Sequence, residues 1–431
     1  MTEPHGSFGV PEGFRFIGPE PGSAPAWPLP DAPDPADIAS CVACGLCLPH
    51  CPTYRLTGEE SASPRGRIAA MRAVSEGVAE VDGRFMEFMD LCLSCRACED
   101  VCPSHVPFGR MMERARSQID PLRPARHRLA RWLGLEVALP RGWLLTLATV
   151  LTPLVRPLLP ARTRELLPRV RVRELARRLP RVTEPTSGEP RGTVGLLAGC
   201  VQDRWYRPVN RATIRVLARS GWRVVVPAGQ VCCGALGAHY GRLASTRKLA
   251  SRNLRAFEGV DWIVVNSAGC GAHMKEYAEL LGSSAGESPR RASAKVRDFM
   301  EFLDEQGIEA PEGNPPVRQV ALHDPCHLLH AQRIHGAQRA VLGKLADLRV
   351  DEVEHGDRCC GAAGLYNVLE PAMADQLKRE KAAAIHATGA PAVLVANPGC
   401  AMQIAAGLRE IGSTTTVMHP AELLDHAYGE P

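Results

Sequence analysis

The chain has 431 residues, of which 45% are hydrophobic and 23% are charged, and its formal net charge is +4 at pH 7. This length allows two or three domains, and the composition is typical of a soluble globular protein. The small net charge gives no reason to predict a nucleic-acid-binding protein, so we expect no nucleic-acid partner.

Residues 1–36 are rich in proline and glycine and contain no apolar run. We therefore expect a leader without a secretory signal, either disordered or wrapped over the surface. Without export, the compartment is reducing and structural disulfides are not expected. Sixteen cysteines in such a chain indicate metal or redox chemistry.

A cysteine motif occurs twice in the first quarter of the chain. CVACGLCLPHCP (residues 41–52) recurs as CLSCRACEDVCP (residues 92–103), with the same spacing and a proline after the last cysteine. In two-cluster ferredoxins the last cysteine of each run binds the other cluster. Zinc is the alternative for four thiolates, although structural zinc sites usually pair two short motifs. The spacing predicts two [4Fe–4S] clusters, one on Cys41, Cys44, Cys47 and Cys102, and one on Cys92, Cys95, Cys98 and Cys51.

The segment between the two motifs has helical features. Ser63 and Pro64 are suited to an N-cap followed by the first helical position, and the apolar residues after them recur at helical spacing. We therefore expect an all-helical ferredoxin domain over residues 37–120. Arg65 and Arg67 either face the negatively charged second cluster or belong to a solvated helix start.

Residues 121–190 are rich in arginine and predict a basic helical linker. Its apolar run WLLTLATVLTPLV (residues 143–155) is shorter than the roughly 20 residues that a membrane-spanning helix needs. Two alternatives remain, a helix packed between domains and an interfacial helix whose flanking arginines meet anionic lipid. The second alternative predicts a cytoplasmic protein that is peripheral on the inner face of the cell membrane.

The last part of the chain contains an internal duplication, found by laying residues 193–281 over 318–411. TVGLLAGC matches QVALHDPC, CCGALG matches CCGAAG, and DWIVVNSAGC matches AVLVANPGC. We call the two copies the first and second CCG repeats, and we expect them to form domains over residues 191–310 and 311–431.

In each CCG repeat, predicted strands alternate with helices, which favours parallel sheets. Sites in such sheets form beyond the carboxyl ends of the strands, where these cysteines lie. The predicted fold is thus an all-helical dicluster ferredoxin domain followed by a duplicated α/β CCG domain. We expect Gly234 and Gly361 to let the backbone approach a bound group closely. The alternative to a further cluster or metal is structural zinc or buried thiols. The candidate residues are Cys200, Cys232, Cys233, Cys270, Cys326, Cys359, Cys360 and Cys400.

These motifs together resemble a known family. CGLCLPHCPTY, SPRGRI, CLSCRACEDVCPS, GCGAHMKEY, HDPCHLLHAQ, CCGAAGLYNV and ANPGC resemble the iron–sulfur subunits of glycolate oxidase over most of residues 37–426. The resemblance implies a subunit of a glycolate dehydrogenase complex that takes electrons from partner flavoproteins. These flavoproteins oxidise glycolate to glyoxylate, and the electrons pass to the membrane quinone pool.

One feature departs from the related heterodisulfide-reductase branch, in which each CCG unit has a further cysteine three positions after its last. Those positions here are His273 and Gln403, so we do not expect that branch's unusual cluster. The chain has no GxGxxG fingerprint and no predicted catalytic residue, so we expect a subunit and not a self-sufficient enzyme. The alternatives are the equivalent subunit of a lactate or glycerol-3-phosphate dehydrogenase, or a thiol–disulfide enzyme resembling heterodisulfide reductase.

Overall fold

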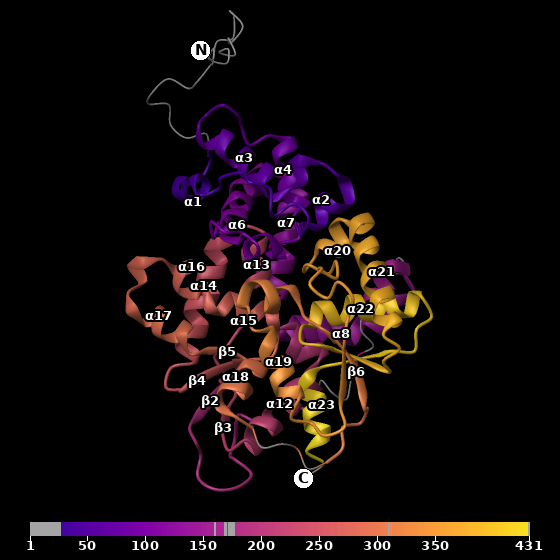
Figure 1. Ribbon diagram of the computed structural model, residues 1–431. Helices are drawn as coiled ribbons and strands as arrows, with labels where there is room; N and C mark the ends of the chain where they lie inside the picture. Colours follow the sequence, from indigo (N-terminus) through magenta and orange to yellow (C-terminus); the bar gives the residue numbers. More distant parts are fainter. Residues whose placement is uncertain are drawn as a thin grey trace, which may run out of the picture.

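The computed structural model describes residues 27–158, 161–167, 170, 177–308, 311 and 313–429. A helical N-terminal region is followed by two α/β units with parallel sheets, as the sequence predicts (Figure 1). Most of the predicted leader, residues 1–26, lies outside the described residues.

The N-terminal region is built from short helices, and the predicted start of the helix between the two cysteine motifs is confirmed. Pro64 is the first residue of its helix, and the Ser63 hydroxyl accepts a hydrogen bond from the Gly66 N–H at 3.0 Å. The core contains Met71, Met89 and Met111 together with the cysteines Cys92 and Cys98. The elements are α1 (Pro35–Ala39), α2 (Pro52–Thr57), η1 (Glu60–Ala62), α3 (Pro64–Ser75), α4 (Gly83–Asp90), α5 (Ala97–Asp100), α6 (Phe108–Ile119) and η2 (Asp120–Leu122).

The described part of the leader wraps the surface of this region. The Trp27 ring meets the ring of Phe85 edge-on at 5.8 Å between centroids, and its indole N–H donates to the Ser75 hydroxyl. The backbone N–H of Leu29 donates to the side-chain oxygen of Gln118 at 2.7 Å.

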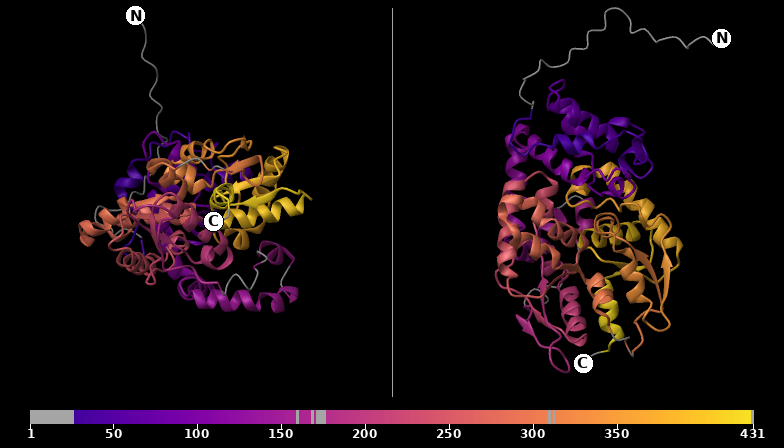
Figure 2. Two further views of the ribbon diagram at one scale, coloured as in Figure 1. Left: turned by 90° about the horizontal axis from the view of Figure 1, so that it is seen from below. Right: turned by 60° about the vertical axis from the view of Figure 1, so that its left-hand side comes forward.

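The basic segment is helical and leaves most of its apolar side chains exposed. It contains α7 (Ala125–Arg131), the π-helix η3 (Trp132–Ala138), α8 (Gly142–Val155), η4 (Arg156–Leu158) and α9 (Ala161–Leu166). Only Leu145 and Thr149 of α8 are buried, and the Thr149 hydroxyl accepts a hydrogen bond from the Trp205 indole at 2.9 Å. This magenta segment lies along the side of the body (Figure 2, left).

The structure was also tested for membrane-spanning helices. No single described helix has the length and apolar character that crossing a membrane requires. One pair passes the same test together, Ala125–Ala138 with Gly142–Leu158, but the two parts meet at a bend of 106°.

The first CCG repeat contains a sheet in the order β1-β3-β2-β4-β5, parallel except for the antiparallel edge strand β1, which comes from the segment predicted as a helical linker. Its strands are β1 (Val182–Thr183), β2 (Thr193–Leu197), β3 (Arg223–Val225), β4 (Trp262–Val265) and β5 (Val296–Asp298). Its helices are α11 (Val201–Trp205), α12 (Arg207–Arg219), α13 (Ala235–His239), α14 (Leu243–Ala256), α15 (Ala268–Lys275), α16 (Tyr277–Leu281), η5 (Ser283–Ala285), α17 (Glu287–Ala294) and α18 (Phe299–Gln306).

The second CCG repeat contains a parallel sheet in the order β7-β6-β8-β9. Its strands are β6 (Gln319–His323), β7 (Arg349–Glu352), β8 (Ala392–Val395) and β9 (Thr416–Met418). Its helices are the π-helix η6 (His327–Gln332), α19 (His335–Leu342), α20 (Tyr366–Leu369), α21 (Pro371–Ala387), α22 (Pro398–Glu410) and α23 (Pro420–Ala427).

The two sheets share one topology, because the order β3-β2-β4-β5 corresponds to β7-β6-β8-β9. The register corresponds too: Leu197 pairs with Val265 at the end of β2, and His323 pairs with Val395 at the end of β6. The internal duplication in the sequence predicts three strands in each repeat. The structure adds the fourth strands β5 and β9 and the edge strand β1.

The three regions pack closely together. One apolar core spans both CCG repeats, with α12 packed against α23 and α18 against α19. The N-terminal helices rest on both repeats, with α6 against α13 and α14, and α2 against α21 (Figure 1). Gly241, with φ of +77°, allows this close approach because an added Cβ would lie 2.4 Å from the backbone of Arg116. This packing brings Cys95 of the N-terminal region to the same apolar cluster as Cys326 and Cys359 of the second repeat.

Candidate functional site

The first group of thiols lies at the surface of the N-terminal region. Cys41, Cys44, Cys47 and Cys102, the ligand set that the spacing predicts, line one small pocket together with Cys98 of the other predicted set. Cys44 is exposed and the other three are half-buried. This site is therefore open to a partner protein from outside.

The two cysteine loops share an unusual backbone. Ala43 and Gly45 have φ of 56° and 85°, and the corresponding Ser94 and Arg96 have φ of 53° and 65°. Non-glycine residues seldom adopt this left-handed conformation, and observed cases cluster at functional sites. Left-handed residues next to right-handed ones turn successive N–H groups into one concavity, which suits an anionic iron–sulfur cluster.

The second group of thiols is deeper in the molecule. Cys51, Cys92 and Cys98 are buried and Cys95 is half-buried. The four lie close enough for their charges to interact, since burial and then the charges of Cys95, Cys92 and Cys51 raise the pKa of Cys98 well above its ordinary value. The backbone N–H of Ser94 also points at the Cys92 sulfur, at 3.4 Å.

Burial also affects the first group, where it raises the pKa of Cys47 to about 11. Iron binds thiolates, so loading these sites releases protons. The donor chemistry fits two [4Fe–4S] clusters: two sets of four thiols, loops with inward N–H groups and little competing polar surface. When bound, such a cluster supplies one-electron redox chemistry, and these cysteines would hold it.

The two arginines at the start of α3 have different surroundings. Arg65 lines the pocket of the first site and pairs with Glu60 at 2.5 Å, so it does not face the second site as expected. Arg67 is 1% exposed, which rules out the solvated alternative for this residue. Its guanidinium donates to the Thr53 hydroxyl at 3.2 Å, and this hydroxyl lies 3.1 Å from the Cys51 sulfur. Arg67 thus reaches the second site through Thr53.

In the first CCG repeat the four thiols form a row. The Cys233 thiol donates to the Cys270 sulfur at 3.1 Å. Cys232 interacts with Cys200 on one side and with Cys233 on the other. The strand ends of β2 and β4 therefore do bring the predicted residues together.

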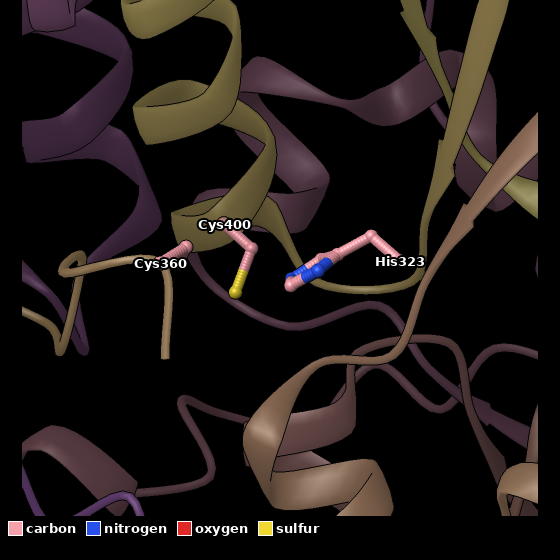
Figure 3. Close-up of side chains that lie close together, drawn as sticks. All are labelled: His323, Cys360 and Cys400. Carbon is pink, nitrogen blue, oxygen red and sulfur yellow. The ribbon is translucent and has the colours of Figure 1, made fainter. Parts of the chain in front are cut away.

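In the second CCG repeat the thiols form a corresponding row of Cys326, Cys359, Cys360 and Cys400. A histidine joins it, because His323 at the end of β6 lies beside Cys360 and Cys400 (Figure 3). One ring nitrogen and the two sulfurs lie within 4.8 Å of one another, and all three residues are buried. Cys400 is in the first turn of α22, where the helix dipole favours a thiolate.

The second ferredoxin loop meets this repeat directly. Cys95 and Cys326 pack against one apolar cluster that contains the buried Cys359, and burial followed by the charge of Cys326 raises the pKa of Cys95 well above its ordinary value. Nearby, His330 is 3.0 Å from a carboxylate oxygen of Asp100 and fixes η6 against α5. The second ferredoxin site and the second CCG repeat are therefore adjacent.

The positions of the missing fifth cysteines are occupied in different ways. Gln403 is fully buried, donates to the Ala374 carbonyl and accepts from Asn367, so its amide is committed to structure. His273 is buried near Cys232, and burial lowers its pKa to about 4. Neither residue reproduces a fifth thiolate.

The two CCG glycines let the backbone approach neighbouring groups closely, and the N–H of Gly361 points at the Cys359 sulfur at 3.5 Å. Gly234 and Gly361 do have positive φ, 89° and 82°. An added Cβ at Gly361 would lie 2.7 Å from the carbonyl of Ala374 in α21, and one at Gly234 would lie 2.9 Å from Thr246 in α14. Each glycine therefore lets its CCG loop approach a helix closely, α14 for Gly234 and α21 for Gly361.

Sequence reasoning missed three residues of these sites. Thr53 and His323 carry no spacing signal, although a histidine at the end of an otherwise apolar strand, where the first repeat has Leu197, could have drawn attention. Arg116 is 5% exposed and donates to the carbonyls of Met89 and Cys92 and to that of His239 in the first repeat. Arg116 therefore links the second ferredoxin cysteine loop to the first CCG repeat.

Comparison with known families agrees with this arrangement. The 4Fe–4S dicluster domain family matches residues 37–106, and the cysteine-rich domain family matches residues 194–275 and 320–405. The first match contains all eight ferredoxin cysteines, and the second pair contains the other eight. The chain thus carries iron–sulfur clusters in a dicluster domain beside two cysteine-rich domains.

Individual relatives are similar over most of the chain. The probable glycolate oxidase iron–sulfur subunit of Bacillus subtilis (strain 168) is 35% identical, over 92% of this chain and 95% of that protein. The glycolate oxidase iron–sulfur subunit of Escherichia coli (strain K12) is 34% identical, over 90% and 94%. Lactate utilization protein A of Shouchella clausii (strain KSM-K16) is 30% identical over 98% of its own length but only 54% of this chain. By identity and coverage, this chain belongs to the family of glycolate oxidase iron–sulfur subunits.

Proposed function

We propose that this chain is the electron-transfer subunit of a flavin-dependent glycolate dehydrogenase. Its flavoprotein partners would oxidise glycolate to glyoxylate, releasing two electrons and two protons, and the chain would deliver the electrons to the quinone pool. A flavin is needed between substrate and clusters because it converts a two-electron oxidation into one-electron steps. The similarity of the glycolate relatives over both halves of the chain supports this substrate.

One observation supports a directional path more than any other. The thiol sites follow one another from the exposed Cys44, through the buried second group, to Cys326 beside Cys95. Electron transfer slows steeply with distance, so adjacent sites favour passage through the chain. The residues between the sites keep water out: Leu93, Tyr366 and Leu377 are all buried in the cluster that contains Cys95 and Cys326.

The residues around the second site favour the reduced, more negative state of a cluster bound there. Buried Arg67 brings a positive charge to Thr53, whose hydroxyl touches Cys51. Arg116 holds the loop of Cys92 and Ser94 by hydrogen bonds to the Cys92 carbonyl and the Ser94 hydroxyl. A fixed positive charge and fixed dipoles near a redox group stabilise its reduced form.

We also propose that α8 rests on the cytoplasmic surface of the membrane. The apolar face of α8 and its neighbours is exposed, with Leu154 at 75% and Leu158 at 85%. Arginines flank it on both sides, at Arg141 and Arg156. An apolar face with basic flanks is typical of a helix that lies in the interface of an anionic bilayer. A membrane quinone would then be within reach of the complex.

The test compares the isolated chain with the native complex that contains its flavoprotein subunits. The isolated chain should not oxidise glycolate with any dye. In the complex, glycolate should lower the visible absorption of the clusters under anaerobic conditions, and a quinone analogue should restore it. Glycolate oxidation by the isolated chain would contradict the proposal. Reduction by lactate or glycerol 3-phosphate, but not by glycolate, would favour a related dehydrogenase.

A further inference from the structure

The two CCG repeats differ at the end of their first strand. His323 ends β6 and Leu197 ends β2, at the same register against β8 and β4. His323 is 1% exposed, and neither ring nitrogen makes a hydrogen bond of normal geometry within the described residues. Its ring lies beside the sulfurs of Cys360 and Cys400, which are weak hydrogen-bond partners. A buried imidazole with such poor partners costs about 1–3 kcal/mol unless it binds a ligand.

The spacing of the donor atoms suits one metal ion. A His nitrogen and the sulfurs of Cys360 and Cys400 all lie within 4.8 Å. Around a tetrahedral zinc ion, bond lengths of about 2.0–2.3 Å place the donors roughly 3.5–3.8 Å apart. Among the residues that the structure describes, no other His, Cys, Asp or Glu side chains form so compact a group. The eight ferredoxin thiols, all described, stay farther apart, as thiolates on separate irons of a cube must.

The two adjacent cysteines of the CCG motif interact with each other but pack in different apolar clusters. Cys360 packs in the apolar cluster that contains Cys400, whereas Cys359 packs against Cys326 and Cys95 in another. The compact donor group contains only Cys360 of the pair, so it does not require two neighbouring cysteines to bind one tetrahedral ion. Lys381, buried and bonded to the carbonyl of His355, lies close enough to Cys360 and Cys400 to balance thiolate charge.

We propose that His323, Cys360 and Cys400 bind a single divalent metal ion of the zinc class, and that the first repeat has no such site. Imidazole and thiolate together select borderline and soft cations such as Zn²⁺ over Mg²⁺ or Ca²⁺. Three protein ligands leave a fourth tetrahedral position, which water or another thiol of the same row can take. The ion sits between β6, the CCG loop and α22, and fixes the wall of the repeat that faces the second ferredoxin site.

The test measures metal content and metal coordination in the full-length chain, loaded anaerobically with iron, sulfide and zinc. Wild type should hold about eight irons and about one zinc. His323→Leu, which copies the residue of the first repeat, should lose the zinc and keep both ferredoxin signals in electron paramagnetic resonance. Cys360→Ser should do the same. The matched control is Cys233→Ser, which removes the equivalent thiol of the first repeat and should leave the zinc in place.

X-ray absorption at the zinc edge gives an independent readout, with an expected shell of one nitrogen and two or three sulfurs. Cobalt substitution should give thiolate-to-metal absorption bands in wild type that disappear in His323→Leu. Retention of zinc in His323→Leu would overturn the proposal, as would an all-sulfur shell. A third cluster, seen as about twelve irons, would overturn it too. None of these results depends on glycolate oxidation, so the proposed function can fail separately.

Discussion

Cys95, in the second ferredoxin loop, packs against the same apolar cluster as Cys326, which follows the first strand of the second CCG repeat. The two residues are far apart in the sequence but close enough for their charges to interact, and the shared cluster joins the ferredoxin region to the repeat that carries His323. By contrast, the exposed Cys44 lies in the surface pocket of the first ferredoxin site. The first ferredoxin site is thus at the surface, the second is deeper, and the second CCG repeat lies next to the second site.

The first prediction separates the two ferredoxin sites. Cys44→Ser should remove one of two electron paramagnetic resonance signals, and Cys95→Ser should remove the other, because the two residues belong to different ligand sets. Cys95→Ser should also stop electron delivery to a quinone analogue in the native complex while glycolate still reduces the remaining signal. If both substitutions remove the same signal, the assignment of ligands is wrong.

The second prediction concerns Thr53, which contacts the Cys51 sulfur and accepts from Arg67. The Thr53 hydroxyl donates to the Ala62 carbonyl at 2.5 Å and accepts from Arg67, so it holds the Arg67 guanidinium near the Cys51 sulfur. Thr53→Val releases this positive charge, which stabilises the reduced state, and should therefore lower the reduction potential of the second site only. A loss of about 1 kcal/mol corresponds to roughly 40 mV for one electron. Redox titration followed by electron paramagnetic resonance measures this shift. Thr53→Ser should restore the potential, and an equal shift at both sites would refute the local explanation.

The third prediction concerns Arg116, whose buried guanidinium donates hydrogen bonds to carbonyls of the ferredoxin region and of the first CCG repeat. Arg116→Leu leaves these carbonyls without donors and should reduce the free energy of unfolding by about 3 kcal/mol or more. Thermal unfolding and the iron content of the second site should both decrease. Arg379→Leu is the control, because that arginine is mostly exposed in its pair with Glu410 and its loss should change the free energy of unfolding far less. Equal losses in the two variants would contradict the role of Arg116.

The fourth prediction is a pH dependence set by His419. Its Nδ1 accepts from the Ala421 N–H, and its Nε2 donates to the carbonyl of Asn266 in the other repeat, so the ring must be neutral. Burial lowers its pKa from 6.5 to about 4. The contribution of neutral His419 to the free energy of unfolding is therefore fully present above pH 6.5 and is lost as the pH falls toward 4. Between pH 6.5 and 5 the loss should be about 2 kcal/mol.

This pH dependence is tested by unfolding wild type and His419→Asn over the same pH range. Asparagine can still accept the hydrogen bond at the start of α23 but cannot be protonated. The variant should be less stable at pH 8, because the contact with Asn266 is lost, and its stability should change less between pH 6.5 and 5. Parallel pH profiles for the two proteins would rule out His419 as the titrating group.

The fifth prediction concerns the exposed apolar face of α8 and η4. The double variant Leu154→Glu and Leu158→Glu should weaken binding to anionic lipid vesicles by roughly tenfold or more, because it removes buried apolar area and adds repulsion. Salt should weaken wild-type binding, since the flanking arginines contribute. Val368→Glu, at another exposed apolar position, is the control and should bind like wild type. Equal binding by all three proteins would contradict membrane contact through α8.

Much of this molecule follows from local patterns in the chain. The paired cysteine motifs predict their own ligand sets because each loop is short and its spacing limits which irons it reaches. The start of α3 at Pro64 follows from the capping chemistry of Ser63. The duplication, seen in the letters around Cys200 and Cys326, predicts two similar sheets, which the structure confirms.

Other features depend on contacts between distant segments and could not be predicted from spacing. His323 meets Cys360 and Cys400 only because β6 pairs with β8, which brings their carboxyl ends together at the start of α22. Cys95 meets Cys326 only because the ferredoxin helices dock on the second repeat. A pattern of apolar residues predicts that a strand or helix is buried but not which neighbour covers it. That choice is made by the packing of the whole chain, and here it positions the thiols relative to one another.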